Sequence, residues 1–292
     1  MPMDMLWVRR AWKRRVATPL RVLVRPETRV EVDGDALLVD LRDTVISRYL
    51  YIEQSYEEGL RRLMRCIDLA GLVCIDVGAN LGLHTVLLAR LAAKVLAFEP
   101  ERRNYSLLER NIVANGLRNV VAFKCAVGDR EGSCQIRLSA ENFGDHRVSA
   151  LATDGNAEDV PMMTIDVAAQ ALEPGSVGFV KIDVQGYEQH VLQGAQNTIA
   201  QNPDLILVVE VSPSHLAAAG ASASGLVTWL VSRGFGGVEL TDDRMVPLGE
   251  AWIYEFMRKE YHVDLVLSRN RGKLASALSS YWGRQVPELG GR

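Results

Sequence analysis

The residues best suited to chemistry stand in the stretch 73-VCIDVGANLGLHTVLLA-89. A short apolar run contains the acid Asp76 and is followed by Gly78, Asn80 and Gly82 at every second position, ahead of a helix-like apolar pattern. Glycine adopts positive φ without steric cost, and asparagine tolerates it better than most side chains. The pattern predicts a strand, a tight turn that a ligand can approach closely, and a helix whose first amides can receive an anion.

A second acid, Glu99, ends the next apolar run 21 residues after Gly78. A carboxylate in that place can hold both hydroxyls of a ribose. The dinucleotide fingerprint GxGxxG is absent, and Asp76 would repel a pyrophosphate but suits a ligand with an ammonium group. S-adenosylmethionine carries an ammonium group and a ribose, so we predict it as the cofactor. The alternatives are a nucleotide-dependent oxidoreductase and a glycine turn that serves packing alone.

These residues need a scaffold, and the chain alternates strand-like with helical stretches from residue 72 onward. The strands are apolar throughout, which favours a parallel sheet covered by helices on both faces. Ligands of such sheets lie beyond the carboxyl ends of the strands. The expected strands are 72–78, 94–100, 119–128, 177–184 and 204–212, and the expected helices lie near 81–92, 101–115, 187–201 and 222–233.

Other segments flank this core. Residues 30–41 alternate around a DGD turn and predict a hairpin, and 53–71 has a helical period. We expect extended segments at 134–140 and 160–168, with a polar stretch at 142–159 between them, and a closing antiparallel pair at 235–242 and 262–269. The predicted division is a basic arm at 1–29, one domain at 30–270 with its cofactor core at about 72–212, and a C-terminal helix and tail at 271–292.

Charge is distributed unevenly. The net charge is -3, yet residues 1–30 hold eight basic residues against two acids, so the rest of the chain is negative. Nucleic-acid binding needs a broad basic surface, so we expect no nucleic-acid partner. The four cysteines form no CxxC pair, which predicts a reduced, cytoplasmic setting without a metal site.

The basic arm is open to two interpretations. No apolar stretch in it is long enough for a secretory signal, and we predict no membrane-spanning helix in the chain. Residues 5–25 mix Leu, Trp and Val with arginines. Such a segment is either a solvated basic arm or a peripheral contact with the anionic inner face of a membrane.

The sequence resembles the FkbM-type S-adenosylmethionine-dependent methyltransferases over about residues 35–240. The block 180-VKIDVQGYEQHVLQGA-195 is the most specific part, and five further blocks appear in order: 75-IDVGANLGLHT-85, 98-FEPE-101, 125-CAVGDREG-132, 163-MTID-166 and 205-LILVVEVSP-213. The resemblance implies a Rossmann-like class I methyltransferase sheet of seven mostly parallel strands, with an N-terminal hairpin and helix. It also implies methyl transfer to oxygen, usually a hydroxyl of a sugar, glycan or secondary metabolite.

The resemblance also implies roles for single residues. Asp183 would face the transferable methyl, and Glu188 and Glu210 would flank the acceptor. Two positions depart from the commoner family pattern, since Gln185 stands where Glu is frequent and His84 where an aromatic residue is frequent. The implied cofactor residues are Asp76, Gly78, Asn80 and Gly82 at the methionine part with Thr85 beside them, Glu99 at the ribose, and Ala126 and Val127 near the adenine.

A hydroxyl acceptor must lose its proton during transfer. Asp183 is the first candidate base, with cofactor orientation as its other role, and His84 is the second because imidazole titrates near neutrality. Glu210 is a third candidate, since an acid that ends an apolar strand needs a partner.

Two residues outside the strands are expected to contact the acceptor: Glu57, which with Tyr56 begins the first core helix, and His146 in the polar stretch. Each could instead be an ordinary surface residue without a role at the site, on a helix face for Glu57 and in a solvent-exposed loop for His146. The alternative function is a non-catalytic S-adenosylmethionine-binding scaffold or regulator. Methylation of nucleic acid is disfavoured, because the fourth core strand runs into 183-DVQGY-187 and not into an Asn/Asp-Pro-Pro-aromatic stretch.

Overall fold

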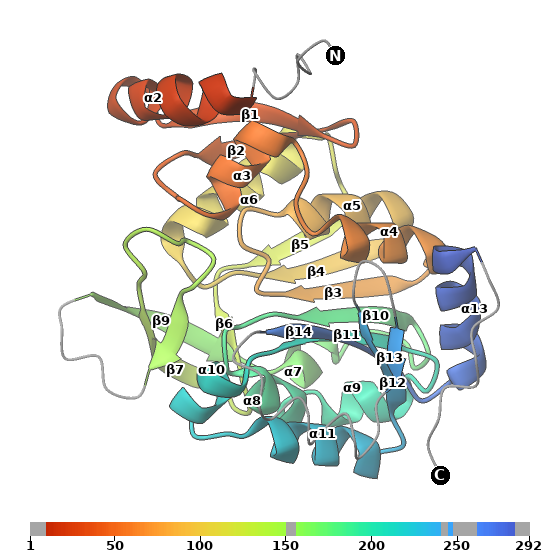
Figure 1. Cartoon of the computed structure of the whole chain (residues 1–292). Coiled ribbons are helices and arrows are strands. Elements are labelled where there is room, and N and C mark those ends of the chain that lie inside the picture. Colours follow the sequence, from red (N-terminus) through yellow and green to blue (C-terminus); the bar gives the residue numbers. More distant parts are fainter. Residues whose placement is uncertain (1–9, 150–155, 241–244, 248–261, 284–292) are drawn as a thin grey trace.

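The computed structural model describes residues 10–149, 156–240, 245–247 and 262–283 (Figure 1). Its central sheet has the strand order β13-β12-β14-β11-β10-β3-β4-β5. The five apolar core strands pair in parallel: β3 (Val73–Val77), β4 (Lys94–Phe98), β5 (Val120–Phe123), β10 (Val177–Ile182) and β11 (Ile206–Val211). The antiparallel strand β14 (Val263–Ser268) lies between β11 and β12 (Gly236–Leu240). The expected seven-stranded sheet is confirmed, with the short edge strand β13 (Met245–Pro247) added.

Helices cover both faces of this sheet (Figure 1). Strand side chains alternate between the two layers, so Phe179 packs on one side and Val180 on the other. One layer holds α4 (Glu58–Cys66), α5 (Leu83–Leu91) and α13 (Arg271–Trp282), and α6 (Arg102–Ala114) packs farther along, against the hairpin and β5. The other layer holds α7 (Ile165–Ala169), α8 (Glu188–Gln193), α9 (Gln196–Gln201), α10 (Pro213–Ala218) and α11 (Ala223–Ser232).

The N-terminal extension is built around the predicted hairpin, β1 (Glu27–Val32) and β2 (Asp35–Asp40). Its turn residues Asp33 and Gly34 both have positive φ, as a two-residue hairpin turn requires. The described part of the basic arm is helical, with a π-helical turn η1 (Lys13–Ala17) followed by α2 (Thr18–Val24), and it lies beside the hairpin (Figure 1). A further helix, α3 (Ile46–Glu53), was not predicted, because its Ile- and Tyr-rich sequence also suits a strand.

The extended segments predicted at 134–140 and 160–168 belong to a second sheet of order β6-β9-β7-β8, and we call this part of the chain the insertion. Its strands are β6 (Ala126–Val127), β7 (Gly132–Arg137), β8 (Arg147–Ser149) and β9 (Ala157–Met163). The expectation of one strand over 119–128 is wrong, because β5 and β6 pair in different sheets. The extended segment also ends early, since Thr164 accepts a hydrogen bond from Val167 N and caps α7.

Two predicted helices have different bounds in the structure. The helix expected over 53–71 spans only Glu58–Cys66. The helix expected over 187–201 is two helices, α8 and α9, that meet at Gly194. A Cβ at Gly194 would lie 2.0 Å from the Gly128 carbonyl oxygen, so the chain needs glycine there. The domain boundaries at residues 29 and 270 stay predictions.

Candidate active site

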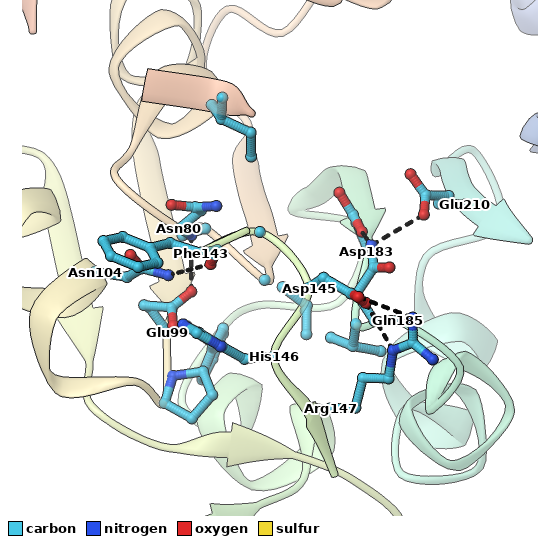
Figure 2. A pocket seen from close by; sticks show the side chains of 18 of the residues that line it. Asn80, Glu99, Asn104, Phe143, Asp145, His146, Arg147, Asp183, Gln185 and Glu210 are labelled. Atoms are coloured by element: carbon cyan, nitrogen blue, oxygen red, sulfur yellow. Dashed lines mark hydrogen bonds and ion pairs between the residues drawn. The ribbon is translucent and has the colours of Figure 1, made fainter. Parts of the chain in front are cut away.

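A cavity of about 390 Å³ lies beyond the carboxyl ends of the parallel strands. The turn after β3 and Glu99 after β4 line one end, and Asp183 after β10 with Glu210 of β11 lines the other (Figure 2). Residues 142–148 of the insertion also line it. The cavity therefore stands where open parallel sheets bind ligands.

The turn after β3 brings three strand ends together. Gly78 has φ +81°, and a Cβ there would lie 1.8 Å from the Asp183 carbonyl oxygen, so only glycine allows this approach. Asn80 also has positive φ, and its backbone N–H donates to Glu99 Oε2 over 2.8 Å. The predicted tight turn is present, and it joins the two ends of the cavity.

Glu99 is oriented by backbone amides. Its Oε1 accepts from Glu101 N over 2.9 Å, and burial raises the pKa of its carboxyl to about 8. A carboxylate oxygen has two lone pairs, so each oxygen can accept a further bond from a hydroxyl. Ala126 and Val127 line the cavity on the same side and are buried. This end fits a ribose beside an apolar slot for a base.

Asp76 lies beneath the turn and does not line the cavity. Thr85 Oγ1 donates to its Oδ2 over 2.6 Å, whereas its Oδ1 is buried and has no hydrogen-bond partner in the described part of the chain. Burial raises the pKa of this carboxyl, and the charge of Lys181 opposes that rise. The unpaired oxygen suits a cationic group placed over the turn.

Gly82 and Thr85, which were also expected at the cofactor, likewise do not line the cavity. Gly82 has φ +93°, and a Cβ there would lie 2.7 Å from Leu108 Cδ1, so this glycine lets α6 pack against the turn. Thr85 holds Asp76. Both residues support the turn from below.

At the opposite end, Asp183 is held by two donors. Lys181 Nζ lies 3.0 Å from Asp183 Oδ2. Gln185 Nε2 donates to Asp183 Oδ1 over 2.8 Å and to Glu210 Oε1 over 3.0 Å (Figure 2). Lys181 is only 4% exposed. Burial alone would lower the pKa of Lys181, but the charges of Asp183, Asp76 and Glu57 raise it above its ordinary value. The ammonium therefore stays charged beside Asp183.

Lys181 was not among the predicted site residues. The available signal was a charged residue inside the apolar strand 177-VGFVKI-182, which is unusual for a buried strand. Register places it directly beside Asp76, since these two residues are partners in the β3–β10 pairing.

The other acids of this end have raised pKa values. Burial raises the pKa of Glu210 to about 10, with Asp183 adding to the rise. Burial likewise raises the pKa of Glu57 to about 8 and that of Asp264 to about 6. The protonated form is therefore favoured most strongly at Glu210, and Asp183 is the carboxyl paired with the ammonium.

His84 and Glu57 face each other inside the cavity, with His84 Nε2 3.2 Å from Glu57 Oε2. The two atoms do not make a well-aligned hydrogen bond. Burial lowers the pKa of His84 well below its ordinary value, so the imidazole is neutral. A neutral imidazole can accept a proton.

Glu188, expected near the acceptor, is buried outside the cavity lining. Its Oε1 accepts from Gly186 N over 2.9 Å and from Val184 N over 3.3 Å, so the side chain holds the loop after β10. This is a correction to its expected role, because the carboxylate is used within the loop.

His146 does line the cavity, and its Nδ1 accepts from Ser139 N over 3.0 Å. It lies beside Glu99, at the end of the cavity opposite Glu210 (Figure 2), so the surface interpretation is wrong and its contact with the acceptor stays a prediction. Burial lowers the pKa of its imidazole.

The insertion forms a roof over the cavity. Asn104 Nδ2 donates to the Phe143 carbonyl over 2.7 Å, and Arg147 pairs with Asp145 at 2.6 Å (Figure 2). Arg147 Nη2 also lies 2.8 Å from His215 Nε2 on α10. These contacts fasten the segment on both sides of the cavity. Within the described residues, no group of three or more His, Cys, Asp and Glu side chains could hold a metal ion.

The comparisons with known proteins agree with this geometry. The family model described as the methyltransferase FkbM domain matches residues 76–236, which is more than half of the chain. The chain belongs to this family. It is an S-adenosylmethionine-dependent methyltransferase, and the oxidoreductase alternative is wrong.

Two curated relatives and one solved structure illustrate the similarity. Methyltransferase 1 of Beauveria bassiana is 25% identical over 198 residues, which cover 59% of this chain and 76% of that protein. Hexuronic acid methyltransferase AglP of Haloferax volcanii is 30% identical over 136 residues, covering 46% and 53% respectively. The structure of TYW2 from M. jannaschii in complex with AdoMet aligns with a TM-score of 0.41 at 15% identity, over 84% of this chain and 87% of that one. That alignment is too weak to bear on function.

Proposed function

We propose that this methyltransferase methylates a hydroxyl oxygen of a sugar, glycan or secondary metabolite. The observation that carries the proposal is the Asp183 carboxylate, which faces the cavity next to the Gly78 turn and is held by Lys181 and Gln185. Bound S-adenosylmethionine supplies an electrophilic methyl group on a sulfonium.

The residues present fit that cofactor from one end of the cavity to the other. Glu99 would hold the ribose hydroxyls, Ala126 and Val127 would line the adenine, and the turn at Gly78 and Asn80 would receive the methionine part over the unpaired Asp76 oxygen. Methyl transfer is a displacement, so alignment of acceptor and methyl supplies most of the catalysis.

Asp183 is our choice for the proton acceptor. A hydroxyl becomes strongly acidic as its oxygen bonds to carbon, so a carboxylate paired with an ammonium is basic enough to take the proton at that stage. Glu210, whose pKa is raised to about 10, holds its proton at neutral pH and is not available for this role. His84, neutral and inside the cavity, is the second candidate.

The acceptor class rests on two supports. The AglP relative is named as a hexuronic acid methyltransferase, which favours a sugar. The cavity cations Lys181 and Arg147 are each paired with a carboxylate, so neither is available for a nucleic-acid phosphate. We propose that nucleic acid is not the acceptor. This needs its own test, because the solved structures that align with this chain include an rRNA methylase and a tRNA methyltransferase.

An assay with radiolabelled S-adenosylmethionine tests this function. Sugars, glycans and polyhydroxylated metabolites would be offered to the wild-type protein and to Asp183→Asn, with RNA as a competing acceptor and calorimetry to follow cofactor binding. We expect Asp183→Asn to bind the cofactor within a few-fold of wild type and to lose about 10²-fold or more in turnover. Methylation of RNA but of no hydroxyl compound in the panel would refute the proposal. Cofactor binding without transfer to any acceptor would favour the scaffold alternative.

We also propose that the N-terminal helix rests on an anionic membrane surface. Trp12 is 58% exposed and Leu20 59% exposed, and they stand eight residues apart with exposed Val16 between them, on one side of a helix rich in arginine. No helix in the described ranges is long and apolar enough to cross a membrane. We expect Leu20→Asp to lower the fraction of protein that co-sediments with phosphatidylglycerol vesicles. An unchanged bound fraction would refute the membrane contact.

The predicted cytoplasmic setting remains part of the proposal. All four cysteines are free thiols, as a reducing compartment requires. Cell fractionation checks it, and recovery of the protein from an oxidising compartment would contradict it.

A further inference from the structure

An apolar groove runs between α2 and α3 and has no role in the chemistry described above. We call it the α2–α3 groove; its apolar walls are Pro19, Val22 and Leu23 on one side and Val45, Tyr49 and Ile52 on the other. Its volume is about 680 Å³. A groove of this size and lining is suited to a hydrocarbon chain.

The groove leaves large apolar side chains in water. Leu23 is 82% exposed, and Tyr49 and Val45 are also exposed. Single exposed apolar residues are ordinary, but a contiguous set along a groove marks an interaction site. Hydrocarbon bound there would remove these surfaces from water, which is favourable in proportion to the area covered.

The groove adjoins the active-site cavity. Val45 lines both, and its neighbours Thr44 and Ile46 line the groove and the cavity respectively. Thr44 N also donates to the Glu141 carbonyl of the roof over 2.7 Å. One end of the groove and the cavity therefore meet at Val45.

Two arginine side chains line the groove. Arg14 and Arg48 line it, against one carboxylate in the lining, Glu53. Glu53 already binds two guanidiniums, Arg14 at 2.6 Å and Arg10 at 2.9 Å. Arg48 Nε donates to the Leu41 carbonyl over 2.8 Å. The N–H groups on its two terminal nitrogens are further donors that could bind a ligand. The excess of guanidinium over carboxylate suits a phosphate.

We propose that the α2–α3 groove binds the hydrocarbon chain of a lipid phosphate that carries the methyl acceptor. The chain lies between α2 and α3, the phosphate meets Arg48 near the groove, and the head group enters the cavity past Val45. This inference rests on the proposed function, because it assigns the acceptor to the class of lipid-linked hydroxyl compounds.

Binding of monomeric dodecyl phosphate, kept below its critical micelle concentration, tests the groove. Calorimetry would compare wild type, Leu23→Ser, Arg48→Gln and the control Val113→Ser, with S-adenosylmethionine titrated into the same samples. Val113 lies on α6, outside the groove lining, and is 78% exposed, so it matches Leu23 in exposure. We expect Leu23→Ser to weaken dodecyl phosphate about tenfold, Arg48→Gln to weaken it similarly, and Val113→Ser to leave it unchanged. Inorganic phosphate alone should not bind measurably.

Several outcomes would overturn the proposal while leaving the cofactor site intact. One is normal S-adenosylmethionine binding without any binding of dodecyl phosphate. A second is equal weakening by Leu23→Ser and Val113→Ser, which would show non-specific adsorption. A third is binding to phosphatidylglycerol vesicles but not to the monomeric amphiphile, which would make the groove a bilayer contact. A fourth is self-association that Leu23→Ser abolishes in a protein that ignores dodecyl phosphate, since a second copy would then occupy the groove. Failure of S-adenosylmethionine binding would instead count against the proposed function.

Discussion

Replacing Lys181 by methionine removes the buried ammonium that lies 3.0 Å from Asp183 Oδ2 and keeps most of the side-chain volume. The lysine is 4% exposed, so solvent cannot take its place. In the variant, Asp183 and Asp76 lose the cation that balances them. We therefore expect Lys181→Met to be among the most destabilising single changes at this end of the cavity.

The magnitude follows from the burial of the pair. Breaking a buried ion pair by removing one partner costs about 3–5 kcal/mol, because the other charge is left unpaired. For a chain of this size, that corresponds to a fall in Tm of roughly 6–20 °C. Asn in place of Asp183 removes the stranded charge, so Lys181→Met/Asp183→Asn should recover about half of the loss.

The pH dependence of the effect has a definite sign. The pKa of Lys181 is raised in the folded protein, so its contribution is fully present below the unfolded-chain value and is lost only as pH rises through the higher folded value. The difference between wild type and Lys181→Met should therefore stay flat from about pH 6 to 9.

Thermal unfolding followed by circular dichroism measures these differences. Lys124→Met is the matched control, because Lys124 is largely exposed and lies 3.8 Å from Glu158, so its loss should cost at most about 1 kcal/mol. A Tm for Lys181→Met within about 2 °C of wild type, or a double variant as unstable as the single one, would refute the reasoning.

Three further predictions concern the turn and the acids. Glu99→Ala should raise the Kd for S-adenosylmethionine about ten- to hundredfold by calorimetry, through loss of the hydrogen bonds to the two ribose hydroxyls, and an unchanged Kd would disprove its ribose role. Gly78→Ala places a Cβ 1.8 Å from the Asp183 carbonyl oxygen, so it should lower Tm far more than the control Gly34→Ala. At Gly34 a Cβ would have no atom within 4 Å, and only the positive φ opposes it, at about 1–2 kcal/mol. Equal falls in Tm for the two variants would contradict the close approach at Gly78. The pKa of Glu210 is raised to about 10 in the folded protein, whereas an unperturbed Glu titrates at about 4.3. The stability contributed by its protonated form therefore falls steadily as pH rises from the unfolded-chain value to about 10, and the fall in Tm between about pH 5 and 10 should be shallower in Glu210→Gln; parallel curves would argue against the raised pKa.

Much of the fold could be predicted because its signals are local. Apolar runs such as Val73–Val77 and the positive-φ turn at Gly78 and Asn80 are encoded within a few residues of one another. The predictions failed where distant partners decide the outcome. Nothing near residues 119–128 indicates that β5 pairs with β4 while β6 pairs with β9. Likewise, α3 is a helix despite a sequence that suits a strand, because its buried Leu50 belongs to the hydrophobic cluster that the hairpin forms with α5 and α6.

The sequence by itself determined the kind of cofactor, because Asp76, Gly78, Asn80 and Glu99 stand at a characteristic spacing along one strand-turn-helix unit and the next strand end. The tertiary structure alone decided the protonation and orientation of the acids at the other end. Register sets Lys181 beside Asp76, and Gln185 links Asp183 to Glu210 across two strands. A pKa depends on burial and on charges brought from distant parts of the chain, and neither can be known until the chain has folded.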